Sequence, residues 1–71
     1  MKHTRRQRTI SVGDHKITVV TTAKTWVRNF VGFRAVVRDN RGNELKIDHL
    51  DVLERNVAED IAFARFVERF C

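Results

Sequence analysis

Cysteine, proline and long apolar runs are scarce or missing in this sequence. The one cysteine, Cys71, is the last residue, so no intrachain disulfide can form and an oxidising compartment is not indicated. No apolar run approaches the ~20 residues that a membrane-spanning helix needs. The basic start of the chain is followed by no continuous apolar segment, which argues against a secretory signal. We therefore expect a cytoplasmic protein that has no membrane partner.

The groups that usually carry chemistry are also few. Three histidines, His3, His15 and His49, are scattered along the chain, and there is no CxxC pair, glycine-rich phosphate loop or nucleophile elbow. Two nearby acids, Asp48 and Asp51, lie at the N-terminal end of an expected helix and are explained by its dipole. We expect no enzymatic activity, no metal site and no cofactor.

What the sequence does contain is enough for one small domain with a strong charge asymmetry. Its 71 residues include five Phe and one Trp for a core, and a chain of this size buries only about 60% of its unfolded surface. Residues 1–46 carry 11 basic and 3 acidic side chains, whereas residues 47–71 carry 3 basic and 6 acidic ones, within a net charge of +5. The small size of the chain favours a homodimer, and the basic excess of residues 1–46 favours an anionic partner.

Two stretches predict β-hairpins with defined registers. In the first, Gly13-Asp14 forms a type II′ turn that pairs Val12 with His15 and Ile10 with Ile17.

In the second, residues 33–48, a three-residue Asn40-Arg41-Gly42 loop places Val37 opposite Leu45 and Ala35 opposite Ile47 on the inner face. The outward pairs are then Arg38 with Glu44 and Arg34 with Asp48, so these two arginines are expected to be partly neutralised.

Residues 23–31 are ambiguous between a short helix and a strand. Apolar residues at Ala23, Trp26, Val27, Phe30 and Val31 follow helical spacing, although several of these residue types are mediocre helix formers. The helix is favoured, and Trp26 and Phe30 are expected in the core in either case.

Residues 48–70 predict a helix, in one or two pieces. Asn56 with Glu59 resembles a capping box. The apolar side is expected to contain Val57, Ile61, Phe63, Ala64, Val67 and Phe70. Phe66 and Arg69 fall on the polar side and are candidate contacts for a protein partner or a second copy.

Together these elements predict a small α+β fold in the order ββ(α)ββα: an antiparallel sheet of two hairpins packed on a C-terminal amphipathic helix. Residues 1–7 are expected to form a flexible basic arm, and residues 8–71 a single compact domain. From about Phe33 onward the order of strand, turn, strand and helix resembles in topology the small DNA-binding domains at the ends of phage-type integrases. No diagnostic motif accompanies this resemblance, so it transfers no functional residue.

The charge distribution leads to the first functional hypothesis, a small basic protein that binds nucleic acid, in particular duplex DNA, with its sheet face and its arm. The candidate binding residues are Lys2, Arg5, Arg6, Arg8, Lys16, Arg34, Arg38 and Arg41. The alternative hypothesis is a docking protein of the kind that phages and mobile elements encode. Such a protein inhibits or adapts a larger protein or nucleoprotein complex, for example a CRISPR surveillance complex.

Overall fold

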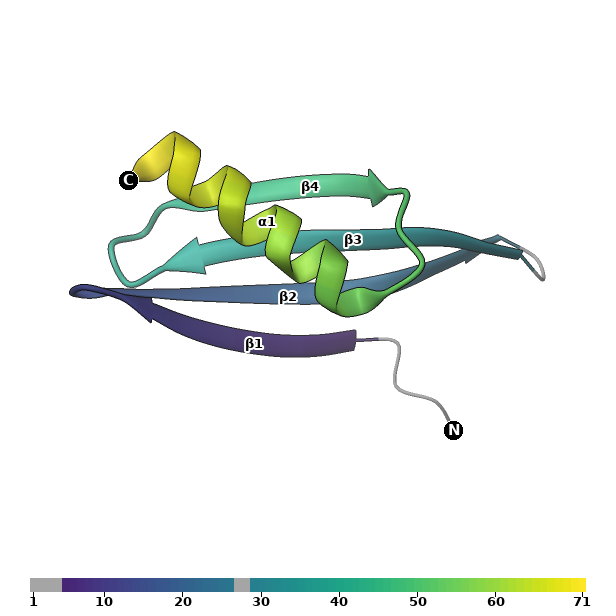
Figure 1. Cartoon of the computed structure of the whole chain (residues 1–71), viewed down its shortest axis with the longest axis horizontal. Coiled ribbons are helices and arrows are strands. Elements are labelled where there is room, and N and C mark those ends of the chain that lie inside the picture. The colour runs from purple at the N-terminus through teal and green to yellow at the C-terminus, as the bar shows by residue number, and fades with distance from the viewer. Residues whose placement is uncertain (1–4, 27–28) are drawn as a thin grey trace.

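The chain folds into a four-stranded antiparallel sheet with one helix across one face (Figure 1). The structure is a computed structural model that describes residues 5–26 and 29–71, with the side chains of residues 25–31 outside the description. The strands are β1 (Arg5–Val12), β2 (His15–Trp26), β3 (Asn29–Asp39) and β4 (Glu44–Leu50), followed by α1 (Arg55–Phe70). The strands lie in sequence order, so each one pairs with the next along the chain. The predicted α+β class, with a hairpin-built sheet on a C-terminal helix, is confirmed.

The first hairpin has the predicted register. Val12 pairs with His15 and Ile10 with Ile17. Gly13, with a φ of 61°, occupies the first turn position, where a type II′ turn requires a positive φ. The alternation of side chains along both strands therefore follows from the turn.

The second hairpin also has the predicted register, with Val37 opposite Leu45 and Ala35 opposite Ile47. Gly42 has a φ of 89°, as the expected bulged turn demands. The carboxylate of Asp39 fixes the turn, since it accepts hydrogen bonds of 2.9 Å from the backbone N–H groups of Arg41 and Asn43.

The favoured helix over residues 23–31 is wrong. β2 continues to Trp26 and β3 begins at Asn29, so the two strands form a long hairpin rather than flanking a helix. The threonines and aromatic residues here are strand formers, and pairing between the two strands overrides the helical spacing. The predicted core positions of Trp26 and Phe30 concern side chains outside the description.

The end of β4 departs from regular geometry. A register shift separates the Phe33–Leu50 pair from the Ala35–Ile47 pair, and His49 has a φ of 59°. Opposite this irregularity Gly32 has a φ of 141°, and a Cβ added there would overlap the carbonyl of Leu50. Only glycine allows the two backbones to approach so closely at this point.

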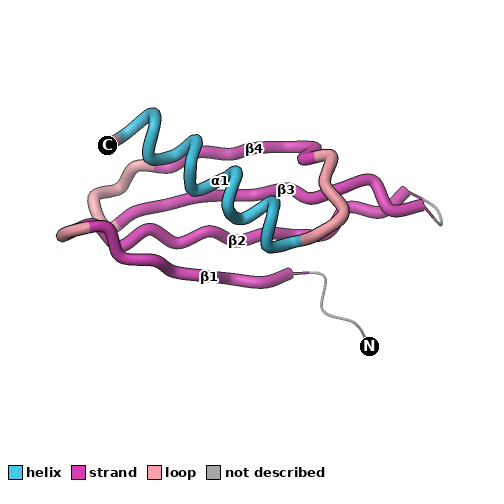
Figure 2. Tube along the Cα trace, viewed as in Figure 1, coloured by secondary structure: helices cyan, strands magenta, loops and turns pink. Residues whose placement is uncertain are grey.

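The helix is a single piece that lies diagonally across the sheet (Figures 1 and 2). It begins at Arg55 and not at Asp48, because residues up to Leu50 belong to β4. The expected capping box is wrong: Glu54 is the N-cap and makes no side-chain capping bond, while Asn56 and Glu59 are inside the helix.

The expected apolar side is correct in part, since Phe63 is buried and Ile61, Val67 and Phe70 pack against the core, whereas Ala64 is exposed. Val57 is exposed and Phe66 is fully buried, so the premise that Phe66 is available to a partner is wrong.

The core lies between the helix and the covered face of the sheet. Among its described side chains, the sheet contributes seven buried apolar residues: Ile17, Val19, Phe33, Ala35, Val37, Ile47 and Leu50. The helix contributes Ala58, Ala62, Phe63 and Phe66. Small alanines let the helix approach the strands closely, and the two phenylalanines fill the remaining space.

Candidate nucleic-acid interface

The face of the sheet that α1 leaves uncovered, called the open face below, is rich in basic and hydroxyl side chains. Alternation along the paired strands assigns its members. They are Arg5, Gln7, Thr9 and Ser11 of β1, Lys16, Thr18, Val20, Thr22 and Lys24 of β2, Arg34, Val36 and Arg38 of β3, and Glu44, Lys46 and Asp48 of β4. Among the described side chains, this face therefore has six basic residues and two acidic ones.

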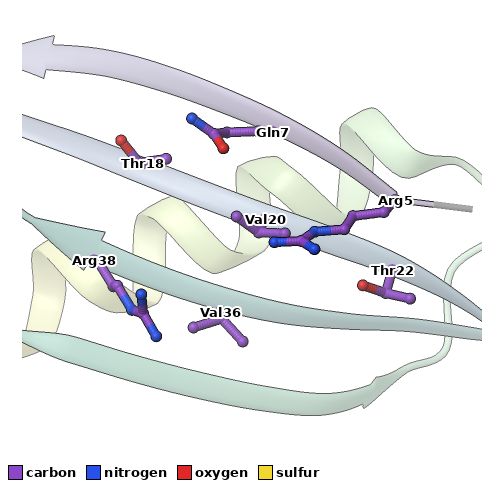
Figure 3. Close-up of a pocket in the computed structure, with 7 residues that line it drawn as sticks. All are labelled: Arg5, Gln7, Thr18, Val20, Thr22, Val36 and Arg38. Atoms are coloured by element: carbon purple, nitrogen blue, oxygen red, sulfur yellow. The ribbon is translucent and has the colours of Figure 1, made fainter.

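A shallow hollow of about 550 Å³ lies near the centre of the open face. Figure 3 shows its lining residues from the open side, with α1 behind the sheet. Val20 and Val36, which are cross-strand partners, form an apolar floor, and Arg5 and Arg38 lie at opposite sides of it (Figure 3). The other lining residues are Gln7, Thr18 and Thr22. Hydroxyl, amide and guanidinium groups around a small apolar floor suit an extended polar ligand that lies across the strands.

Two of the arginines on the open face already have acidic partners. The Arg34 Nε donates to Asp48 Oδ1 at 2.6 Å, and Arg38 donates to the carboxylate of Glu44. Both pairs link β3 to β4 and were predicted from the register. The side chains are substantially exposed, so each pair contributes a few tenths of a kcal/mol at most, and the charges remain partly neutralised.

The other four cations of the open face have no acidic partner in the described part of the chain. They are Arg5, Lys16, Lys24 and Lys46. Lys24 was not among the predicted binding residues, because residues 23–31 were expected to be helical. Strand alternation through β2 would have found it.

Arg6 and Arg8 lie on the opposite face and bind the helix. Two nitrogens of Arg6 contact the carboxylate of Glu59 at 2.7 and 2.9 Å, and Arg8 donates to the same carboxylate at 3.3 Å. Glu59 is fully buried, whereas the two arginines are about half exposed. The guanidinium of Arg8 also lies 6.0 Å from the centre of the Phe63 ring. These two arginines join β1 to α1 and are poorly placed to contact a ligand on the open face.

The pKa of Glu59 reflects this arrangement. Burial by itself raises the pKa of the carboxyl, but the hydrogen bond and charge of Arg6, together with those of Arg8, outweigh burial and hold the pKa below its ordinary value. The hydrogen bond to Glu59 raises the pKa of Arg6 in turn. Glu59 is therefore an ionised carboxylate inside the fold.

The remaining predicted site residues are dispersed. Arg5, Arg6 and Gln7 belong to β1, so the expected flexible arm of residues 1–7 is wrong for these three, and Lys2 lies outside the described residues. Arg41 is exposed at the tip of the turn between β3 and β4. Arg69 is exposed near the end of α1, where its guanidinium lies 5.7 Å from the Phe70 ring centre.

No group of three or more potential metal ligands occurs in residues 5–26 and 29–71. Cys71 is exposed, with its sulfur 3.3 Å from Nδ1 of His15. Within the same ranges no helix has both the length and the apolar character needed to cross a membrane. Comparison with protein-family models, with curated proteins and with solved structures finds nothing similar to this chain.

Proposed function

We propose that the protein binds nucleic acid through the open face of its sheet. One observation carries the proposal: Arg5, Lys16, Lys24 and Lys46 share this face without acidic partners among the described residues. Phosphate groups are the common ligands of such spaced, solvated cations, because each contact releases a condensed counterion. The hydroxyl groups of Thr18 and Thr22 supply further donors to phosphate or sugar oxygens.

Duplex DNA is the substrate that we propose. A small antiparallel sheet can lie in or across a groove of the duplex, with alternate side chains directed at the DNA. The Arg34–Asp48 and Arg38–Glu44 pairs then flank the contact, and either arginine can exchange its carboxylate for a phosphate at modest cost, since both pairs are exposed.

Salt dependence tests the proposal directly. Four phosphate contacts predict that the logarithm of the association constant falls with the logarithm of salt concentration at a slope of about −3 to −4. The measurement is fluorescence anisotropy of a labelled duplex, titrated with protein at several salt concentrations. A Lys24→Ala variant should reduce the slope by about one unit. Arg55→Ala on the helix, which also removes one positive charge, should leave the slope unchanged. A flat slope, or no binding at low ionic strength, would reject the proposal.

The alternative is docking onto a larger protein or nucleoprotein complex. The specific observation in its favour is the apolar floor of Val20 and Val36, which a phosphate backbone does not need. If the protein docks onto such a partner, Val20→Ser should weaken binding to that partner more than Lys24→Ala does. The opposite ranking in the DNA titration supports direct binding.

A further inference from the structure

The two edges of the sheet differ in charge: β1 is basic at its start, whereas charges alternate in sign along β4. β1, at one edge, begins with arginine at three of its first four positions. A second copy that paired with this region would bring like charges together, which is a common way for proteins to block edge pairing. β4, at the other edge, carries Glu44, Lys46 and Asp48 at successive positions of the open face, so its charges alternate in sign.

The backbone of β4 has hydrogen-bonding groups available along this edge. In the described residues β4 pairs with β3 and with no other strand. The turn bond from the N–H of Asp39 to the carbonyl of Asn43 sets the alternation of the ladder. By this alternation the N–H and C=O groups of Glu44, Lys46 and Asp48 are directed away from β3.

The edge is also shaped to receive a strand. A hollow of about 440 Å³ lies between residues 45–48 of β4 and Arg65, Glu68 and Arg69 of α1. The C-terminal half of α1 crosses β4 on the covered face (Figures 1 and 2). A strand added to β4 would have this part of the helix on one side and the solvent of the open face on the other.

We propose that β4 pairs antiparallel with β4 of a second copy, about a two-fold axis at Ile47. This register places Lys46 of each copy opposite Asp48 of the other, and it joins backbone groups that both point outward. A register centred on Lys46 instead opposes the two Lys46 side chains and brings Glu44 against Asp48. An axis at Leu45 would also oppose unlike charges, Glu44 and Lys46, but it would pair only residues 44–46 of the two strands, whereas the axis at Ile47 pairs the whole of β4. Charge complementarity and the length of the ladder together therefore select the axis at Ile47.

An exposed leucine gives independent support. Leu53, in the loop between β4 and α1, is 87% exposed. A two-fold rotation normal to the sheet at the β4 edge carries the C-terminal turns of the partner's helix toward this loop, as the arrangement in Figure 1 indicates. The dimer would thus cover an apolar side chain that the single chain leaves in water.

The pairing goes beyond nucleic-acid binding but has a consequence for it. A two-fold axis normal to the sheet keeps both helices on one side and joins the two open faces into one continuous surface. In this dimer Lys46 is paired with Asp48 of the other copy, so each half brings Arg5, Lys16 and Lys24 to the joint surface as its cations without acidic partners among the described residues.

Sedimentation equilibrium without nucleic acid tests the pairing independently of the proposed function. The wild-type chain should show a concentration-dependent mass that approaches twice the monomer value. Lys46→Glu and Asp48→Lys should each raise the dimer dissociation constant by about tenfold or more, since each places like charges across both symmetric contacts. An equimolar mixture of the two variants should associate as well as the wild type does, because opposite charges then face each other again. Lys16→Glu, on β2, makes the same change of charge as Lys46→Glu and should leave the mass unchanged.

A wild-type chain that stays monomeric at every concentration overturns the proposal. So does a mixture of folded variants that fails to associate, or a Lys16→Glu variant that is as impaired as Lys46→Glu. Circular dichroism checks that each variant is folded. If either charge variant is unfolded, Leu53→Ser replaces it: this exposed substitution should weaken association several-fold without altering the fold, and unchanged association rejects the model.

Discussion

The two faces of the sheet use the same residue types for different purposes, and the neighbouring residues Arg5 and Arg6 show this most clearly. Arg6 lies on the covered face and binds the buried carboxylate of Glu59 at 2.7 Å. Arg5 lies on the open face beside the hollow and has no acidic partner in the described ranges. Because successive side chains of a strand point to opposite faces, one position along the chain separates a structural arginine from a candidate ligand-binding one.

The difference extends to the rest of each face. On the covered face, charge is tolerated only where a partner neutralises it, as in the contacts of Arg6 and Arg8 with Glu59. On the open face, water solvates the cations, so they can remain unpaired and available to a ligand. A run of basic residues in a sequence therefore does not define a basic surface until its strand register is known.

Removing the aromatic centre of the covered face should have the largest effect. Phe66 is fully buried, so Phe66→Ala should lower the free energy of unfolding by about 3–5 kcal/mol. Chemical denaturation followed by circular dichroism measures this. Val57→Ala, on the exposed side of the same helix, is the control and should cost well under about 1 kcal/mol. Similar losses for both variants would contradict the observed helix orientation.

The second largest effect on stability is expected at the buried carboxylate of Glu59. Glu59→Gln keeps the size of the side chain but removes its charge, and it should cost about 2 kcal/mol in the free energy of unfolding. Asp60→Asn, one residue later and largely exposed, should change stability by no more than about 0.5 kcal/mol.

Lowering the pH should remove the stabilisation that the ionised carboxylate of Glu59 provides. Because the pKa of Glu59 is lowered in the folded state, its contribution is complete above the unfolded-state pKa of about 4.3 and is lost as the pH falls through the folded-state value. The stability difference between the wild type and Glu59→Gln should therefore be constant near neutral pH and shrink in strong acid. A difference that grows in acid would show that the arginines do not hold the carboxylate ionised.

The adjacent arginines should separate binding from stability. Arg5→Ala should weaken DNA binding several-fold at moderate salt and reduce the salt slope by about one unit, with little change in the denaturation midpoint. Arg6→Ala should lower the denaturation midpoint and leave DNA binding and its salt slope nearly unchanged, because it removes the main partner of Glu59. Equal effects of both variants on binding would mean that the two faces are not distinct in function.

The exposed pair on the open face should give the smallest effect. Exchanging Arg34 and Asp48 in one double variant should restore most of the few tenths of a kcal/mol that either single exchange costs. Denaturation midpoints of the four chains of this double-mutant cycle provide the test. Strictly additive losses would contradict the contact between the two side chains.

Local turn chemistry made the hairpins predictable. Gly13 and Gly42 mark turns whose lengths fix the register, and the registers place the Arg34–Asp48 and Arg38–Glu44 pairs correctly. The same reasoning failed over residues 23–31, because no glycine marks the connection between Trp26 and Asn29 and the apolar spacing favoured a helix. No local sequence feature of residues 23–31 indicates that they form a long hairpin.

The helix orientation shows the same limit. The helical pattern treated Glu59 as a surface residue and therefore placed Phe66, which lies beside it, on the polar side. Glu59 is buried only because Arg6 and Arg8, more than 50 positions earlier in the chain, reach its carboxylate. The split of the basic residues between two faces likewise became visible only when β1 was known to begin at Arg5.

The sequential order of the strands has a consequence for how the chain acquires its structure. Each strand finds its partner in the segment that has just preceded it, so the sheet can assemble hairpin by hairpin from contacts that are close in sequence. The contact between Arg6 and Glu59 spans 53 positions and must await the helix. During folding the strands can therefore pair before the ion pair between β1 and α1 forms, and the packing of α1 completes the domain.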